Sequence, residues 1–244
     1  MRKSFCSLIS FLLFSLLACG AASAHWYVAP TGNDANNGSK RKPLKTIAAA
    51  LQRVNPGDTV FLREGSYGEF VVPTRSGKPG KMITLKSYPG ETAKIDGSDL
   101  YIKGWGNALV QVNNIDYMQF ENLHICHAHD SENNTDPEGI YITGTSGNIT
   151  FRGCKVYDIK NDCPLVDAKG DWRSAHAILV LGTDDNTPIR NLLIEKCEIF
   201  EIHSGTSEAF TLAGNVVDFT IQDNEVHDVE TVSYTHLTLP TTSR

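Results

Sequence analysis

Glu138, His176 and Glu208 are the residues in this sequence whose type and spacing most resemble a reaction centre. Each stands just before a short segment with the composition of a β-strand, and these segments are 140–143, 178–181 and 210–213. If the strands stack, the three side chains lie one above the next, close enough to couple their pKa values and exchange protons. Turn-forming residues at strand ends would give the same pattern, so both interpretations stay open.

A second set of titratable residues marks the start of the loops that lead into those strands. Its members are His127, Asp158, Glu201 and Asp228. Stacked carboxylates repel one another unless a cation or a histidine lies between them, which makes Ca²⁺ the expected ion. Asp and His also satisfy backbone groups at turns, and that explanation is the simpler one for this column.

The longest of these loops, 158–176, carries acidic and basic residues in alternation. Carboxylate oxygens are the ligands that Ca²⁺ prefers, and the candidate ligands are Asp158, Asp162 and Asp167. Basic side chains can neutralise the carboxylate of an acidic sugar, and the candidates are Lys169 and Arg173. A solvated loop of mixed charge has the same composition.

Aromatic side chains near the same loops are candidates for contacts with sugar rings. Trp172 lies inside the long loop, where its ring is available for stacking on a sugar. Tyr141 and His127 complete the predicted substrate-binding set. His124 and His129 flank His127, but the strand pattern turns His124 outward in mid-strand, so we assign no zinc site to the three histidines.

The elements that must position these candidates come from a motif that occurs four times. The copies are 117–128, 148–159, 191–202 and 218–229, and they align without gaps. Apolar residues fall at every second position, the period of a β-strand, and a tight corner divides each copy. The corner residues are Asn122, Gly153, Lys196 and Asp223.

The motif is constant while the loops between its copies differ in length, so the motif is the structural unit. Each copy is followed by the third strand of its unit. Three strands per unit, repeated with insertions, predict an all-β, single-stranded parallel β-helix in which 59–230 form the coils and share one core. A β-sandwich would not require aligned columns.

Four cysteines follow the first 24 residues, and two of them fall in one column of the motif. Cys154 and Cys197 share that column, which predicts buried thiols. Cys126 and Cys163 lie near the same corner on consecutive coils, where an oxidising compartment would allow a disulfide.

The first 24 residues have the pattern of an export signal. Arg2 and Lys3 precede the apolar run 8–17, which is too short to span a membrane, and small residues at 22–24 predict cleavage before His25. A lipoprotein signal ending at Cys19 is the alternative. Removing 1–24 takes away two positive charges and no acidic residue, which changes the formal net charge from −6 to −8 and argues against nucleic acid as a partner.

Residues 25–58 predict a strand, a polar loop and an amphipathic helix that caps the open end of the coils. The sequence of this segment resembles that of secreted right-handed parallel β-helix proteins of the pectate-lyase-like superfamily, which includes family-nine-like polysaccharide lyases. Residues 77–97 show the same resemblance, with the sequence GKPGKMITLKSYPGETAKIDG. The resemblance spans about 26–230. It implies a right-handed helix and a monomer that is secreted, periplasmic or on the cell surface.

The resemblance also implies a polysaccharide partner and, as the leading function, a lyase that cleaves a uronate-containing polysaccharide by β-elimination. The family's calcium and lysine motif has no residue-by-residue match here, so loop composition supplies the candidates: Lys169 or Arg173 as the base, and Asp158, Asp162 and Asp167 as Ca²⁺ ligands. An inverting glycoside hydrolase would instead pair Glu138 with Glu208. A non-catalytic glycan-binding surface protein is the third alternative, because this scaffold hosts many functions.

The end of the chain departs from the repeat. Residues 231–244 lack both the alternation and a corner residue, and VSYTHLTLPTTSR resembles translated sequencing-adapter read-through. We therefore expect a β-helix truncated at its C-terminus, with the natural protein continuing past residue 231.

Overall fold

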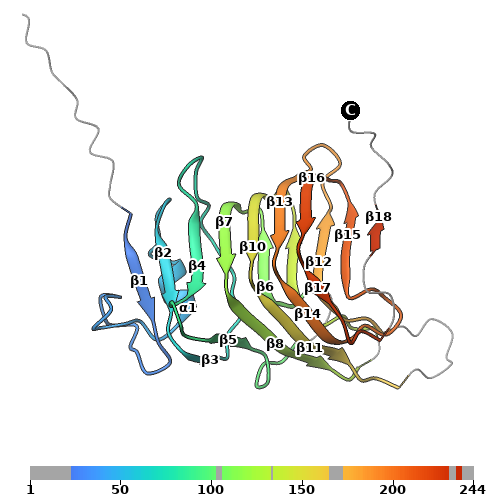
Figure 1. Ribbon diagram of the computed structural model, residues 1–244, viewed down its shortest axis with the longest axis horizontal. Coiled ribbons are helices and arrows are strands. Elements are labelled where there is room, and N and C mark those ends of the chain that lie inside the picture. Colours follow the sequence, from blue (N-terminus) through green and yellow to red (C-terminus); the bar gives the residue numbers. More distant parts are fainter. Residues whose placement is uncertain (1–22, 103–105, 133, 165–172, 231–234, 238–244) are drawn as a thin grey trace, which may run out of the picture.

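The computed structural model describes residues 23–102, 106–132, 134–164, 173–230 and 235–237, and these form a stack of parallel strands (Figure 1). From residue 83 onward, each successive coil adds one strand to each of three sheets. The sheet ladders that join the named strands are all parallel, which confirms the predicted all-β solenoid. No helix in this part of the chain is long and apolar enough to cross a membrane.

The strands of each sheet follow one another along the stack. The first sheet contains β1 (His25–Val28), β2 (Thr59–Leu62), β4 (Ile83–Ser87), β7 (Asp116–Glu121), β10 (Gly147–Arg152), β13 (Ile189–Glu195) and β16 (Val216–Gln222). The second contains β3 (Gly65–Tyr67), β5 (Ala93–Asp96), β8 (Leu123–Asp130), β11 (Lys155–Asn161), β14 (Glu198–His203) and β17 (Glu225–Val226). The third contains β6 (Ala108–Asn113), β9 (Glu138–Thr143), β12 (His176–Gly182), β15 (Phe210–Gly214) and β18 (Thr235–Leu237).

The corners between the first and second sheets have the backbone geometry that the motif predicts. Asn122, Gly153, Lys196 and Asp223 all have positive φ, between 53° and 62°. A single residue in the left-handed region turns the chain sharply, and Gly or Asn enters that region at little cost. The equal geometry of four different residue types shows that the stacking of coils determines the corner.

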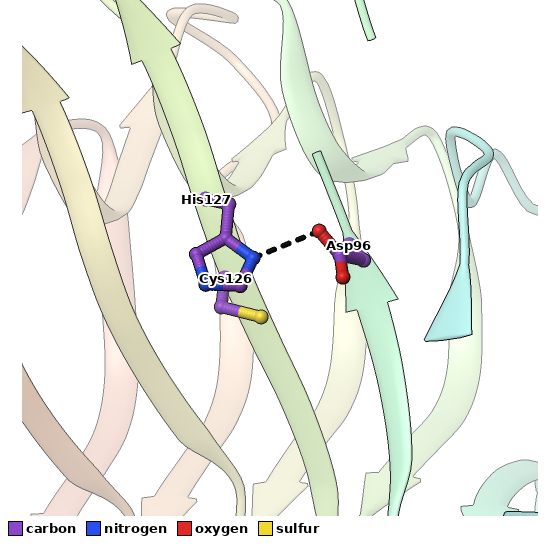
Figure 2. A group of neighbouring side chains, drawn as sticks. All are labelled: Asp96, Cys126 and His127. Atoms are coloured by element: carbon purple, nitrogen blue, oxygen red, sulfur yellow. Dashed lines mark hydrogen bonds and ion pairs between the residues drawn. The ribbon is translucent and has the colours of Figure 1, made fainter. Parts of the chain in front are cut away.

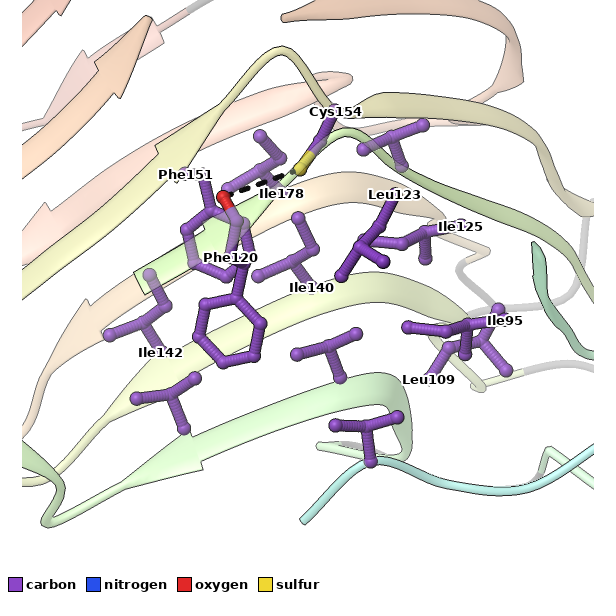
Figure 3. Close-up of a cluster of buried hydrophobic side chains, with 14 of the residues drawn as sticks. Ile95, Leu109, Phe120, Leu123, Ile125, Ile140, Ile142, Phe151, Cys154 and Ile178 are labelled. Atoms are coloured by element: carbon purple, nitrogen blue, oxygen red, sulfur yellow. Dashed lines mark hydrogen bonds between the residues drawn. The ribbon is translucent and has the colours of Figure 1, made fainter. Parts of the chain in front are cut away.

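The core consists of side chains that repeat from coil to coil. Phe120 lies on Phe151 with ring centroids 4.5 Å apart and planes 5° from parallel, and both rings are fully buried. Ile140 and Ile178 enter the same core from the third sheet (Figure 3). Each coil therefore buries its apolar face only when its neighbours are present.

The four cysteines of the coils are free thiols. The Cys126–Cys163 disulfide that the sequence allowed is therefore absent from the structure. Cys154 and Cys197 are 1% and 2% exposed, and Asn224 continues their column by accepting a hydrogen bond from the backbone N–H of Cys197 (2.8 Å). The column predicted by the repeat is confirmed.

A thiol-labelling experiment tests the solution accessibility of this column. Cys154 and Cys197 should react with a polar thiol reagent at least ~10²-fold more slowly in the native protein than in the unfolded chain, because labelling requires an opening of the core. The measurement is the labelling rate of each peptide by mass spectrometry. Native labelling of both thiols at the unfolded rate would contradict the buried column.

Both ends of the stack carry short elements. Helix α1 (Ile47–Leu51) packs against β1 and β2, with Thr46 as its N-cap and Ile47 buried. That this helix caps the solenoid stays a prediction. At the other end, β18 pairs in parallel with β15, so part of 231–244 continues the third sheet.

Candidate active site

The residues at the loop ends meet at the start of the third sheet. His176 pairs with Glu138 across β12 and β9, and the pairing of Ile178 with Phe210 continues the register toward Glu208. Gly139 faces the interior, because a Cβ there would lie 2.7 Å from Val156, a core residue. Glu138 therefore points to the outer side of the strand.

Glu138 is a fully buried acid. The side chain is 0% exposed, and neither carboxyl oxygen has a hydrogen-bond partner of good geometry among the described residues. Burial, helped by the neighbouring charge of Asp136, raises the pKa of Glu138 to about 9, and the nearby Gly106 amide offsets only part of this shift. Glu138 is thus a neutral carboxylic acid at pH 7.

His176 lies at the centre of a hydrogen-bonded chain that crosses three coils. Its Nδ1 lies 2.8 Å from Oδ1 of Asp136, and its Nε2 lies 2.9 Å from Oγ of Ser207. Oγ of Ser207 lies 3.1 Å from a carboxylate oxygen of Glu208, which also accepts from the Thr211 hydroxyl at 3.3 Å. Because Asp136 is an acceptor, it favours the tautomer with hydrogen on Nδ1 and leaves the Nε2 lone pair toward Ser207.

The cluster is closed on one side and open on the other. Asp136 is 2% exposed and His176 5%, while Ser207 and Glu208 are half-buried. A ligand would therefore approach His176 from the side of Ser207 and Glu208. Tyr141 lies near the closed side, where burial raises the pKa of its hydroxyl, with Glu138 and Asp136 adding to the shift.

The pH dependence of stability tests the neutral state of Glu138. Its folded pKa, about 9, is above the unfolded value of 4.5, so the unfolded chain loses this proton first as pH rises. Between pH 4.5 and about 9 the free energy of unfolding therefore falls as pH rises, because of Glu138. The substitution Glu138→Gln removes this pH dependence. The variant should gain ~1 kcal/mol or more relative to wild type between pH 5 and pH 8, measured by urea unfolding. A difference that does not change with pH would contradict a neutral Glu138.

Arg173 lies apart from this chain of hydrogen bonds. Its guanidinium donates to the backbone oxygen of Cys163 (2.9 Å) and pairs with Glu230 (3.0 Å). The pair with Glu230 ties Arg173 to a later coil. Lys169, Trp172 and Asp167 lie outside the described residues.

The loop-start residues form backbone corners. His127, Asp158, Glu201 and Asp228 have positive φ, between 52° and 62°. They occupy equivalent positions on four coils, and Asp enters the left-handed region more readily than most residues. This backbone geometry agrees with the turn interpretation of the column.

Asp158 and Asp162 already contact a cation, the ammonium group of Lys160. Its Nζ lies 3.5 Å from Asp158 and 3.9 Å from Asp162. Asp158 also pairs with His129 at 3.0 Å. In the structure Asp158 and Asp162 are therefore both paired with basic side chains.

Sequence reasoning missed Asp136 and Ser207, the two partners of His176. Each stands within two residues of a predicted site residue, Asp136 before Glu138 and Ser207 before Glu208. Their position just before the strands could have identified them. Polar residues are common in such loops, however, so position alone does not distinguish a site residue from a turn residue.

The stacked parallel coils and their repeated corners define a parallel β-helix protein. The chain belongs to the family described as Pel9A-like, right handed beta helix region, whose model matches residues 26–217. This membership confirms the predicted superfamily and the right-handed coil.

Two curated relatives show how far the similarity extends. The uncharacterized protein YwoF of Bacillus subtilis is 32% identical over 203 residues, which cover 83% of this chain and 41% of that protein. Pectate lyase PEL9 of Emericella nidulans is 26% identical over 147 residues, covering 56% of this chain and 34% of that protein. The chain thus spans less than half the length of these relatives.

Solved structures show the same fold. The GH136 lacto-N-biosidase from Eubacterium ramulus superposes with a TM-score of 0.61 at 16% identity, covering 78% of this chain and 36% of that one. Pectate lyase Pel9A superposes with a TM-score of 0.53 at 21% identity, covering 80% of this chain and 51% of that one. At these identities the likeness concerns the fold alone.

Proposed function

We propose that this chain acts as an exported, monomeric lyase that cleaves a uronate-containing polysaccharide by β-elimination. The family membership and the similarity to pectate lyase PEL9 support the reaction class. The observation that carries the site is the chain Asp136–His176–Ser207 beside the neutral acid Glu138. This choice is supported by the strand pairing of Glu138 with His176 and by the contact of Ser207 with both His176 and Glu208.

His176 is the base in this proposal. Its Nε2 lone pair takes the proton from the sugar carbon next to the carboxylate, while Asp136 holds the imidazole by Nδ1 and stabilises the imidazolium that forms. The electron pair released forms a carbon–carbon double bond, and the bond to the glycosidic oxygen breaks. That oxygen leaves with a proton, for which the Ser207 hydroxyl provides a path from the imidazolium.

Glu138 contributes through its neutrality. An ionised carboxylate at this position would repel the uronate carboxylate and its developing negative charge, whereas a protonated one does not. In this scheme Arg173 holds the loop in place, and His176 takes the role of base for which Arg173 was a candidate. Lys169 stays a candidate that the described residues do not address.

Calcium binding by Asp158, Asp162 and Asp167 stays a prediction. A substitution of Lys160, which pairs with two of these aspartates, provides its test. Millimolar Ca²⁺ should raise the melting temperature of Lys160→Ala more than that of wild type, because removing the ammonium group leaves the carboxylates unpaired. Differential scanning calorimetry measures both shifts. Equal shifts, or none in either protein, would exclude these aspartates as a calcium site blocked by Lys160.

The proposed function is tested by incubating the protein with polygalacturonate and with neutral glycans. Elimination leaves an unsaturated uronide that absorbs in the ultraviolet, and we expect absorbance to rise on the acidic polymer only. New reducing ends without absorbance would favour hydrolysis by Glu138 and Glu208 and overturn the lyase. Binding without cleavage would leave the glycan-binding alternative.

A further inference from the structure

We propose that Asp96, Cys126 and His127 form a binding site for a thiophilic divalent metal ion, with zinc as the best fit. The three side chains lie on the outer side of the second sheet, where β5 pairs with β8 (Figure 2). The site shares none of its three residues with the loop-end cluster around His176, and it does not depend on the proposed lyase activity.

The backbone of β8 explains how consecutive residues reach one ion. In a regular strand Cys126 and His127 would point to opposite faces of the sheet. His127 has a φ of 62°, which breaks the alternation. Figure 2 shows the imidazole and the thiol on the same side, next to Asp96. The parallel register places Asp96 directly beside Cys126 on the preceding coil.

The donor atoms are already close to a coordination geometry. Nδ1 of His127 lies 2.8 Å from Oδ1 of Asp96, and the three residues each offer one ligand atom within 4.8 Å of the other two. Tetrahedral zinc with its usual bond lengths separates such ligands by about 3.3–3.8 Å. Small side-chain movements therefore suffice. The hydroxyl of Ser98, which now contacts both Asp96 and His127, would move aside.

The carboxylate of Asp158 lies near the other ring nitrogen of His127. Nε2 of His127 lies 3.7 Å from Oδ2 of Asp158, which is itself held by His129. Histidines that bind metals usually donate their other ring N–H to a carboxylate, which fixes the tautomer and the ring orientation. At 3.7 Å this carboxylate is just beyond hydrogen-bond distance of Nε2, so a small movement of the ring toward Asp158 would make that contact and direct the Nδ1 lone pair at the ion.

The ligand set selects the metal. A thiolate, an imidazole and a carboxylate suit zinc, whereas calcium and magnesium prefer oxygen ligands alone. Binding releases the thiol proton of Cys126 to solvent. Three protein ligands leave a fourth position for water. His124 is not part of the site, because its Nδ1 faces the Tyr157 hydroxyl at 3.5 Å.

Cobalt spectroscopy on the metal-free whole protein tests the site. A Cys-bound Co²⁺ ion gives a sulfur-to-cobalt charge-transfer band in the near ultraviolet, and added Zn²⁺ should abolish it. We expect the band in wild type and in Cys154→Ala, which removes a buried thiol elsewhere. It should be lost in Cys126→Ala, and Asp96→Asn should weaken Co²⁺ binding at least ~10-fold.

Each result decides the proposal. No band in wild type at saturating Co²⁺ overturns it, and so does a band that persists in Cys126→Ala. If Cys126→Ala does not fold, the wild-type band and the affinity of Asp96→Asn still decide, because unchanged affinity in that variant removes Asp96 from the site.

Discussion

Replacing His176 by alanine should lower turnover of an acidic polysaccharide by ~10²-fold or more, the usual effect of losing a general base. His176 contacts both Asp136 and Ser207, so its loss breaks the hydrogen-bonded chain at its centre. The measurement is the initial rate of ultraviolet absorbance with saturating polygalacturonate. His203→Ala is the matched control, since His203 is an exposed histidine on the neighbouring sheet.

Asp136→Asn separates catalysis from structure at the same site. An amide keeps the shape of Asp136 but stabilises the imidazolium less, so kcat should fall while KM changes little. A purely structural Asp136 would leave kcat unchanged. Full activity of His176→Ala would remove His176 from the mechanism.

Phe151→Ala should lower the free energy of unfolding by about 3–5 kcal/mol, the range for truncating a buried phenylalanine. Phe151 is fully buried and stacks on Phe120, so the substitution leaves a cavity between two coils. Urea unfolding measures the change. Val72→Ala, at a position 46% exposed, should change stability by no more than ~0.5 kcal/mol. A loss below ~1 kcal/mol for Phe151→Ala would contradict the shared core.

The coils could be predicted from sequence because their signal is periodic. Inward residues of stacked strands repeat at equal positions, and the structure pairs Ile149 with Leu192 and Val156 with Ile199 as the alignment requires. The corners at Asn122 and Gly153 could also be predicted, because few residue types enter the left-handed region readily.

The site was harder to predict because its contacts cross coils through loops of unequal length. The column of Glu138 and His176 was predicted from the strand starts, and the register confirms their pairing. Asp136 reaches His176 across 40 residues of sequence, and no period relates the two. The ion pair between Arg173 and Glu230 also depends on loop conformation and could not be predicted from the repeat.

Digestion of polygalacturonate in water enriched in ¹⁸O is the most direct test of the central claim, that the bond breaks by elimination. Hydrolysis adds an oxygen from water to the new reducing end, whereas elimination adds none. Products are analysed by mass spectrometry immediately after short digestion, with a known hydrolase as the control for labelling. Elimination predicts an unlabelled, unsaturated uronide from the wild-type protein and little product from His176→Ala. Saturated products that carry ¹⁸O would contradict the account.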